Sequence, residues 1–117
     1  MLDHNRPPGK TTVSPEVLTS ITRMAVLSVP GVSSLAPVPG GVDRIFRRGM
    51  DDGVRITVHE NSVLVDIYLI VKNDVNIREV GRNVQMQVSR AIQEMVAMDV
   101  AQVDIHIENI AYEGTEA

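Results

Sequence analysis

Three arginines lie within five positions of the chain and surround its only phenylalanine. The stretch GVDRIFRRGMDDG, residues 41–53, contains Arg44, Phe46, Arg47 and Arg48. Guanidinium groups bind phosphates and carboxylates through paired hydrogen bonds, and arginine and aromatic residues are enriched at the energetic centres of protein interfaces. Three interpretations stay open. The stretch is a solvated charge cluster neutralised by nearby aspartates, a protein-docking element anchored by Phe46, or a site for a small ligand or nucleic acid.

Two histidines and two aspartates form a second set of residues that could do chemistry. Strand alternation directs His59, Asp66, Asp104 and His106 to one face of the expected sheet. Imidazole nitrogens and carboxylate oxygens are the ligands of catalytic zinc sites. Alternation assigns the face of each side chain but not the order or register of the strands. A zinc-type site and an ordinary solvated polar face therefore both stay open, and no metal or cofactor is assigned.

Familiar catalytic motifs are absent from the sequence. It contains no G-x-x-x-x-G-K-[ST] phosphate loop, no G-x-G-x-x-G turn, no H-E-x-x-H and no G-x-S-x-G. An RNA-recognition motif would need aromatic residues on its sheet, and aromatics make up 3% of this chain. The sequence predicts no catalytic residue and no enzyme.

Two amphipathic helices are expected to position these groups. The sequence SPE at 14–16 combines a capping serine, a proline suited to the first turn and an acidic residue, and PG at 30–31 ends that helix. Asn76 and Glu79 resemble a capping box, which predicts a second helix from there to the region 95–98.

Four strands are expected around these helices. The runs are KTTVS at 10–14, VRITVHE at 54–60, VLVDIYLIVK at 63–72 and VAQVDIHIENI at 100–110. The middle two form a hairpin, and residues 32–53 are expected to be irregular. In the last run the residues predicted to face inward are Ala101, Val103, Ile105 and Ile107.

This pattern predicts an α+β, two-layer sandwich in the order β-α-β-β-α-β. Two helices with one apolar stripe each cover only one face of a mainly antiparallel sheet, and a ferredoxin-like arrangement fits that order. The open face then carries Leu64, Tyr68 and Ile70. These apolar residues either contact a protein partner or a second copy, or are covered by the chain's own loop or tail.

Length and composition set the remaining expectations. The 117 residues suit a single domain at 9–112, with a flexible leader at 1–8 and a frayed tail at 113–117. A net charge of −4 argues against general affinity for nucleic acid, and the absence of cysteine excludes thiolate chemistry. Because the longest apolar run is too short to span a bilayer, we expect a cytoplasmic protein without direct membrane insertion.

The order of these signals resembles the alkaline shock protein family of bacterial envelope stress-response proteins. The resemblance covers residues 9–110. Its features are Gly9, Ser14-Pro15-Glu16-Val17, Gly31-Val32, Gly53-Val54, the strand that contains Asp66, Ile77-Arg78-Glu79-Val80, and the last strand from Val103 to Ile107.

The resemblance implies a cytoplasmic, non-enzymatic protein tied to cell-envelope homeostasis. Some relatives gather at the membrane through a separate membrane-anchored partner, and others are linked to lipid synthesis. The expectation is therefore an interaction or scaffold protein that associates with itself, as a homo-oligomer, and with a membrane-anchored or envelope-linked protein. The alternative is a small-ligand or nucleic-acid binding domain that uses Arg44, Arg47 and Arg48.

Overall fold

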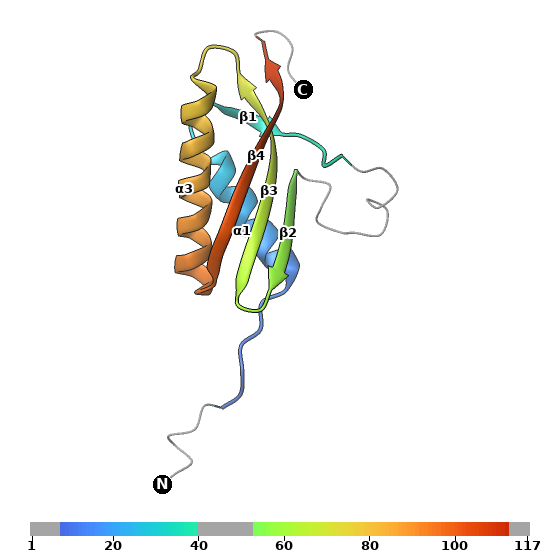
Figure 1. Cartoon of the computed structure of the whole chain (residues 1–117), viewed down its shortest axis with the longest axis vertical. Coiled ribbons are helices and arrows are strands. Elements are labelled where there is room, and N and C mark those ends of the chain that lie inside the picture. The colour runs from blue at the N-terminus through green and yellow to red at the C-terminus, as the bar shows by residue number, and fades with distance from the viewer. Residues whose placement is uncertain (1–7, 40–52, 113–117) are drawn as a thin grey trace.

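The computed structural model of the chain describes residues 8–39 and 53–112. The domain boundaries expected at both ends stay a prediction. Within the described residues there are two helices and four strands (Figure 1). They are α1 (Pro15–Leu27), β1 (Val32–Leu35), β2 (Val54–His59), β3 (Ser62–Lys72), α3 (Ile77–Val96) and β4 (Asp99–Ala111).

Strand β3 is the centre of the sheet and contacts all three other strands. Strand β4 lies parallel to it along its whole length, from the pair Ser62–Asp99 to the pair Lys72–Ala111. Strands β1 and β2 are both antiparallel to β3, β1 at residues 69–71 and β2 at residues 62–67. Since β4 occupies one edge of β3, β1 and β2 follow one another along the opposite edge.

Tyr68 joins β1 and β2 into one interrupted strand. Its backbone carbonyl accepts a hydrogen bond of 2.8 Å from the Ala36 amide, and its own amide donates one of 2.8 Å to the Gly53 carbonyl. The chain leaves the sheet after Ala36 and returns at Gly53, opposite the same residue. Gly53 has φ +84°, and a Cβ there would lie 2.7 Å from the Ala36 carbonyl oxygen. This return point therefore requires glycine.

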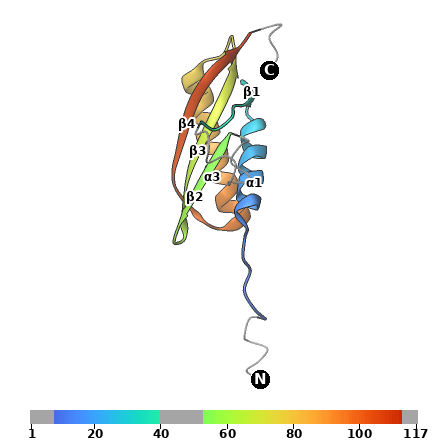
Figure 2. The same cartoon turned by 90° about the vertical axis from the view of Figure 1, so that its right-hand side faces the viewer.

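The core lies between the sheet and both helices. One row of β3 side chains, Val63, Val65, Ile67, Leu69 and Val71, is fully or almost fully buried against α1 and α3. From α3 the buried residues are Val80, Val84, Val88 and Ile92, at the spacing of one helix face. In the turned view of Figure 2, α1 stands to one side of the strands. The predicted two-layer α+β sandwich, with its helices on one face, is confirmed.

Both helix starts are confirmed as predicted. The Ser14 side chain accepts a hydrogen bond of 3.3 Å from the Val17 amide. The Asn76 side chain accepts one of 3.0 Å from the Glu79 amide. The Asn76 bond satisfies an amide of the first turn, and the Val17 amide also donates to the Ser14 carbonyl at 3.0 Å. These capping contacts are made by residues close in the sequence, which explains why local sequence sufficed to locate the helix starts.

The predicted strand order needs one correction. Residues 10–14 form no strand, and the described chain runs α-β-β-β-α-β, so it departs from the ferredoxin-like order. The fourth strand of the sheet is instead β1, which comes from the segment 32–53 that was expected to be irregular. Val13 instead packs against the core without strand pairing. With β4 on one edge of β3 and β1 and β2 on the other, no edge of β3 is left for residues 10–14.

The inward row of β4 also differs from the prediction at one residue. Val103, Ile105 and Ile107 face the core as expected, but Ala101 is exposed. The register shifts by one residue between the Val63 and Leu64 pairs of β3, so Val100 packs inward in place of Ala101. A bulge of this kind leaves no mark in the alternation of apolar residues.

Candidate functional site

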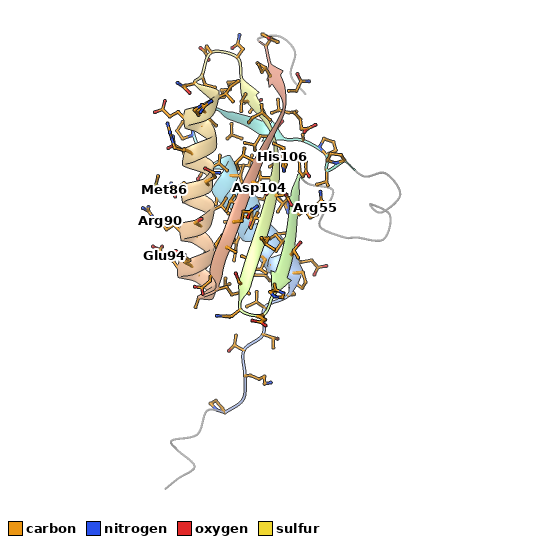
Figure 3. The ribbon with its side chains drawn as sticks, in the orientation of Figure 1. Arg55, Met86, Arg90, Glu94, Asp104 and His106 are labelled. Carbon is orange, nitrogen blue, oxygen red and sulfur yellow. The ribbon has the colours of Figure 1, made fainter. Side chains whose placement is uncertain are left out.

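The face of the sheet opposite the helices carries two transverse rows of mostly polar side chains. Strand pairing aligns Arg55, Asp66 and Asp104 in one row, one residue from each long strand. The next row holds Thr57, Leu64 and Gln102. Figure 3 looks onto this face and labels Arg55 on β2 and Asp104 and His106 on β4. We call these six residues together with Tyr68 and His106 the open face.

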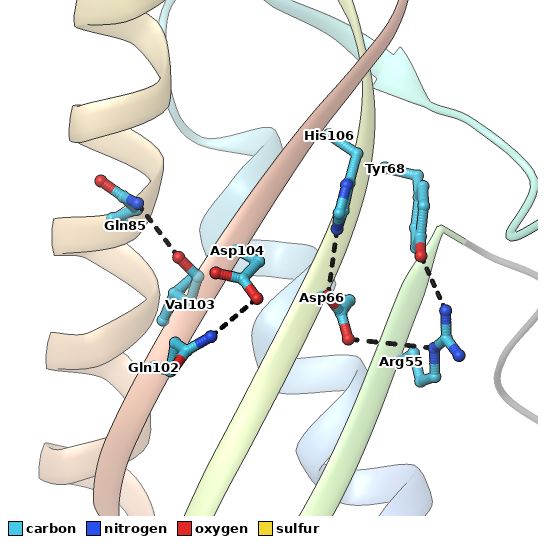
Figure 4. Close-up of polar contacts among 8 residues, drawn as sticks. All are labelled: Arg55, Asp66, Tyr68, Gln85, Gln102, Val103, Asp104 and His106. Carbon is cyan, nitrogen blue, oxygen red and sulfur yellow. Dashed lines mark hydrogen bonds and ion pairs between the residues drawn. The ribbon is translucent and has the colours of Figure 1, made fainter.

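Asp66 is the centre of a polar cluster on the open face. Its Oδ1 lies 3.0 Å from His106 Nε2, and its Oδ2 lies 3.9 Å from Arg55 Nε (Figure 4). Arg55 Nη2 donates a hydrogen bond of 2.7 Å to the hydroxyl of Tyr68. The cluster therefore links β2, β3 and β4 through side chains as well as through the backbone.

The cluster further favours the cationic form of Arg55. The hydrogen bond with Tyr68 is the main cause that raises the pKa of Arg55 above its ordinary value, and the charge of Asp66 adds to it. The side chains of Arg55 and Asp66 are 39% and 29% exposed, so solvent screens their attraction. The main effect of the ion pair is to orient Arg55 on the open face.

Tyr68 lies beneath the start of the long connection that leaves the sheet. Its ring stacks on His106 with centroids 4.4 Å apart and an interplanar angle of 13°. It is 6% exposed and forms a small second core with Ala36 and Val38, against which Ile70 packs. The chain's own residues therefore cover this end of the open face, while Leu64 stays 36% exposed at the other.

A groove of about 480 Å³ lies between α3 and β4, away from the open face. One wall carries two cationic side chains one helical turn apart, Arg78 and Arg82. Gln85 continues this wall and donates a hydrogen bond of 3.0 Å to the Val103 carbonyl. The other residues that line the groove are Ile77, Gly81, Ile105 and Ile107.

Comparison with known proteins places the chain in a family. Residues 3–112 match the alkaline shock protein 23 family, described by a cell envelope-related function. The chain belongs to this family. It is 33% identical over 108 residues to the uncharacterised protein Spy1535 of Streptococcus pyogenes, with 92% of this chain and 83% of that protein covered. It is 26% identical over 107 residues to the uncharacterised protein YqhY of Bacillus subtilis (strain 168), covering 90% of this chain and 79% of that protein. No solved structure matches.

This member of the alkaline shock protein 23 family brings together only part of the predicted zinc constellation. Asp66 and His106 meet, but Asp104 accepts a hydrogen bond from Gln102 at 2.9 Å, and His59 lies at the far end of β2. Within the described ranges, no group of three or more histidine, cysteine or acidic side chains is arranged to hold a metal ion. The four residues do not converge.

The structure separates the other predicted residues. Leu64 is exposed on the open face, whereas Tyr68 and Ile70 pack under Ala36 and Val38. The roles predicted for the arginine stretch fall outside the described residues, which stop at 39 and resume at 53. That stretch comprises Arg44, Phe46, Arg47 and Arg48.

Sequence reasoning did not single out Arg55 or the groove. Arg55 was one polar residue in an alternating run, and its contact with Tyr68 depends on strand pairing. The groove left a weak signal, two arginines flanking Gly81 on one helix face. None of the helices in the described part of the chain has the length and apolarity to cross a membrane.

Proposed function

We propose that this protein is a non-enzymatic cytoplasmic interaction or scaffold protein linked to the cell-envelope stress response or to envelope homeostasis. It acts by self-association and by binding a membrane-anchored or envelope-linked protein. The family's cell envelope-related function supports the setting. The observation that carries the proposal is the open face, where an exposed Leu64 sits among ordered polar side chains.

The open face has the composition of a protein-binding surface. Leu64 supplies an apolar centre, and Thr57 and Gln102 flank it in the same row. Arg55 and Asp66 stand in the next row, already oriented by their mutual contacts. Interfaces typically combine an apolar centre with a polar rim, and side chains that are fixed beforehand lose less entropy on binding.

Replacing Leu64 tests the proposal most directly. Leu64→Arg puts a charge at the centre of the open face, and the matched control is Met86→Arg, at a 56% exposed position of α3 on another surface. We expect the native protein to exceed the 12.8 kDa monomer in light scattering and to recover an envelope-linked protein by cross-linking in its native cells. Leu64→Arg should lose at least one of these associations, and Met86→Arg should keep both.

Two results would contradict the proposal. One is a native protein that stays monomeric at all concentrations and cross-links to no envelope-linked protein. The other is equal association by the Leu64→Arg and Met86→Arg variants. Both positions are on the surface, so we expect both variants to fold. A circular dichroism spectrum of each variant checks that the fold is retained.

A further inference from the structure

We propose that the groove between α3 and β4 binds an acidic, extended segment of a protein partner. The segment adds as a strand to the free edge of β4 and places its carboxylates on Arg78 and Arg82. This inference rests on the proposed function, since it gives the partner's binding segment a chemistry and a place.

The outer edge of β4 offers unpaired backbone groups along the groove. Tyr68 directs both its amide and its carbonyl to β1 and β2, so its neighbours Ile67 and Leu69 direct theirs to β4. These two lie opposite Ile105 and Ile107. In a parallel pair of strands, only one residue of each opposed pair bonds to the neighbouring strand. The amide and carbonyl of the other residue point away from that strand.

The amides and carbonyls of Ile105 and Ile107 therefore point away from β3, toward the outer edge of β4. No other strand among residues 8–39 and 53–112 pairs with this edge. The Val103 carbonyl on the same strand also points away from β3, because it accepts its hydrogen bond from the Gln85 side chain of α3 and not from a strand. An exposed strand edge of this kind is a template for an added strand.

Charge on the groove wall selects the kind of segment. Arg78 and Arg82 are exposed, and their guanidinium groups make no hydrogen bond or ion pair within the described part of the chain. One helical turn places them about 6 Å apart along α3. Alternate residues of a strand lie about 6.6 Å apart on one face. Two acidic residues separated by one residue would thus match the two guanidinium groups.

The floor of the groove admits the backbone of such a segment. Gly81 contributes no side chain, and a Cβ there would have its nearest neighbour at 3.9 Å, on Ile105. Ile77, Ile105 and Ile107 line the rest and offer apolar contact to the aliphatic parts of an added strand. The groove therefore combines an edge for main-chain bonds with charges for selectivity.

A second copy of this chain fits the groove less well. Edge-to-edge pairing of β4 with its twofold mate would bring the same patch of both copies together. Arg78 and Arg82 of one copy would then approach those of the other across the joined edge. Like charges at close range disfavour that pairing, whereas an acidic segment is attracted.

The test is selection from a random-peptide library displayed on phage, using the whole protein as bait. We expect the recovered peptides to share two acidic residues separated by one residue. A recovered peptide should shift the amide resonances of Ile105 and Ile107 and slow their hydrogen exchange. Arg78→Glu and Arg82→Glu should each weaken its binding at least tenfold.

Arg90→Glu is the matched control, because it makes the same charge change elsewhere on α3 (Figure 3). Peptides without an acidic bias, or equal binding by the Arg78→Glu and Arg90→Glu variants, would overturn the inference. So would concentration-dependent shifts at Ile105 and Ile107 without peptide, which would indicate a second copy.

The two proposals can fail separately. If Arg78→Glu still cross-links to the envelope-linked partner as the native protein does, while peptide selection yields nothing dependent on that arginine, the groove inference fails and the proposed function stands. If acidic peptides bind the groove but no envelope-linked protein is recovered from cells, the proposed function fails and the groove remains.

Discussion

At the scale of single residues, Tyr68 connects more parts of the molecule than any other residue of the open face. Its backbone holds the end of β1 and the start of β2, and its hydroxyl accepts from Arg55. Its ring stacks on His106 and is buried under Val38. Alternation placed Tyr68 on the correct face, but these contacts depend on residues distant in the sequence, which local patterns do not encode.

Replacing Tyr68 by phenylalanine isolates the contribution of the hydroxyl. The stacking and burial of the ring remain, while Arg55 loses the hydroxyl that accepts its hydrogen bond of 2.7 Å. We expect the free energy of unfolding in urea to fall by about 1 kcal/mol, in the range for one partly exposed hydrogen bond. Full additivity with Arg55→Met in a double-mutant cycle would show that the two side chains are not coupled.

The effect of this substitution should be constant around neutral pH. The Tyr68 contact raises the pKa of Arg55, so the stabilisation is fully present below the ordinary pKa of arginine. It is lost only as the pH rises through the raised value in strong alkali. Unfolding curves of the native protein and Tyr68→Phe at mildly acidic and mildly alkaline pH should therefore give the same difference.

Gly53→Ala should be among the most damaging small substitutions. The residue has φ +84°, and the added methyl group would meet the Ala36 carbonyl oxygen and the Leu35 Cβ, both at 2.7 Å. We expect a loss of at least about 2 kcal/mol in chemical denaturation, from backbone strain and overlap together. A loss below half that value would mean that the junction of β1 and β2 relaxes easily.

At the scale of elements, the sequence located those whose signals are local. Both helices and the β2–β3 hairpin follow from capping residues and periodicity within each segment. Strand β1 was missed because VSSL is short and half polar, and it becomes a strand only by pairing with the distant β3. The strand predicted at 10–14 had residues suited to a strand, but both edges of the central β3 are taken by β1, β2 and β4. Local propensity therefore did not decide which segments joined β3.

The same small substitution at Gly81 should have the opposite sign to that at Gly53. Gly81 lies inside α3, and a methyl group would make an ordinary contact at 3.9 Å with Ile105. Alanine favours the helix by up to about 1 kcal/mol over glycine. Gly81→Ala should therefore raise the melting temperature in calorimetry. A lower melting temperature would show that α3 and β4 approach more closely than this distance.

At the scale of the whole molecule, the two proposed binding surfaces lie on different sides of the sheet. The open face centres on Leu64 of β3, while the groove lies where α3 meets the outer edge of β4. One copy could then associate with itself through one surface and with an envelope-linked partner through the other. Family membership followed from the order of motifs, and strand alternation placed Leu64 on the open face. The groove was not predicted, because it is assembled from two segments that are separate in the sequence.

Replacing residues 40–52 with a short glycine-serine linker should leave the sheet intact. The backbones of Ala36 and Gly53 are both hydrogen-bonded to Tyr68, so even a short connection can join the two ends. Halving a loop changes its closure free energy by only about 0.6 kcal/mol. The amide spectrum of β3 should be conserved. Association measured on this variant also tests the docking role predicted for Phe46 and its neighbouring arginines.

The junction at Tyr68 also bears on what proteolysis can do to this protein. A single cut between residues 40 and 52 would leave two pieces, one with α1 and β1 and the other with β2, β3, α3 and β4. Val26 and Val29 of the first piece share a buried core with Ile67, Leu69 and Val88 of the second. A nicked molecule should therefore migrate as one species in its native state and separate into two only when denatured.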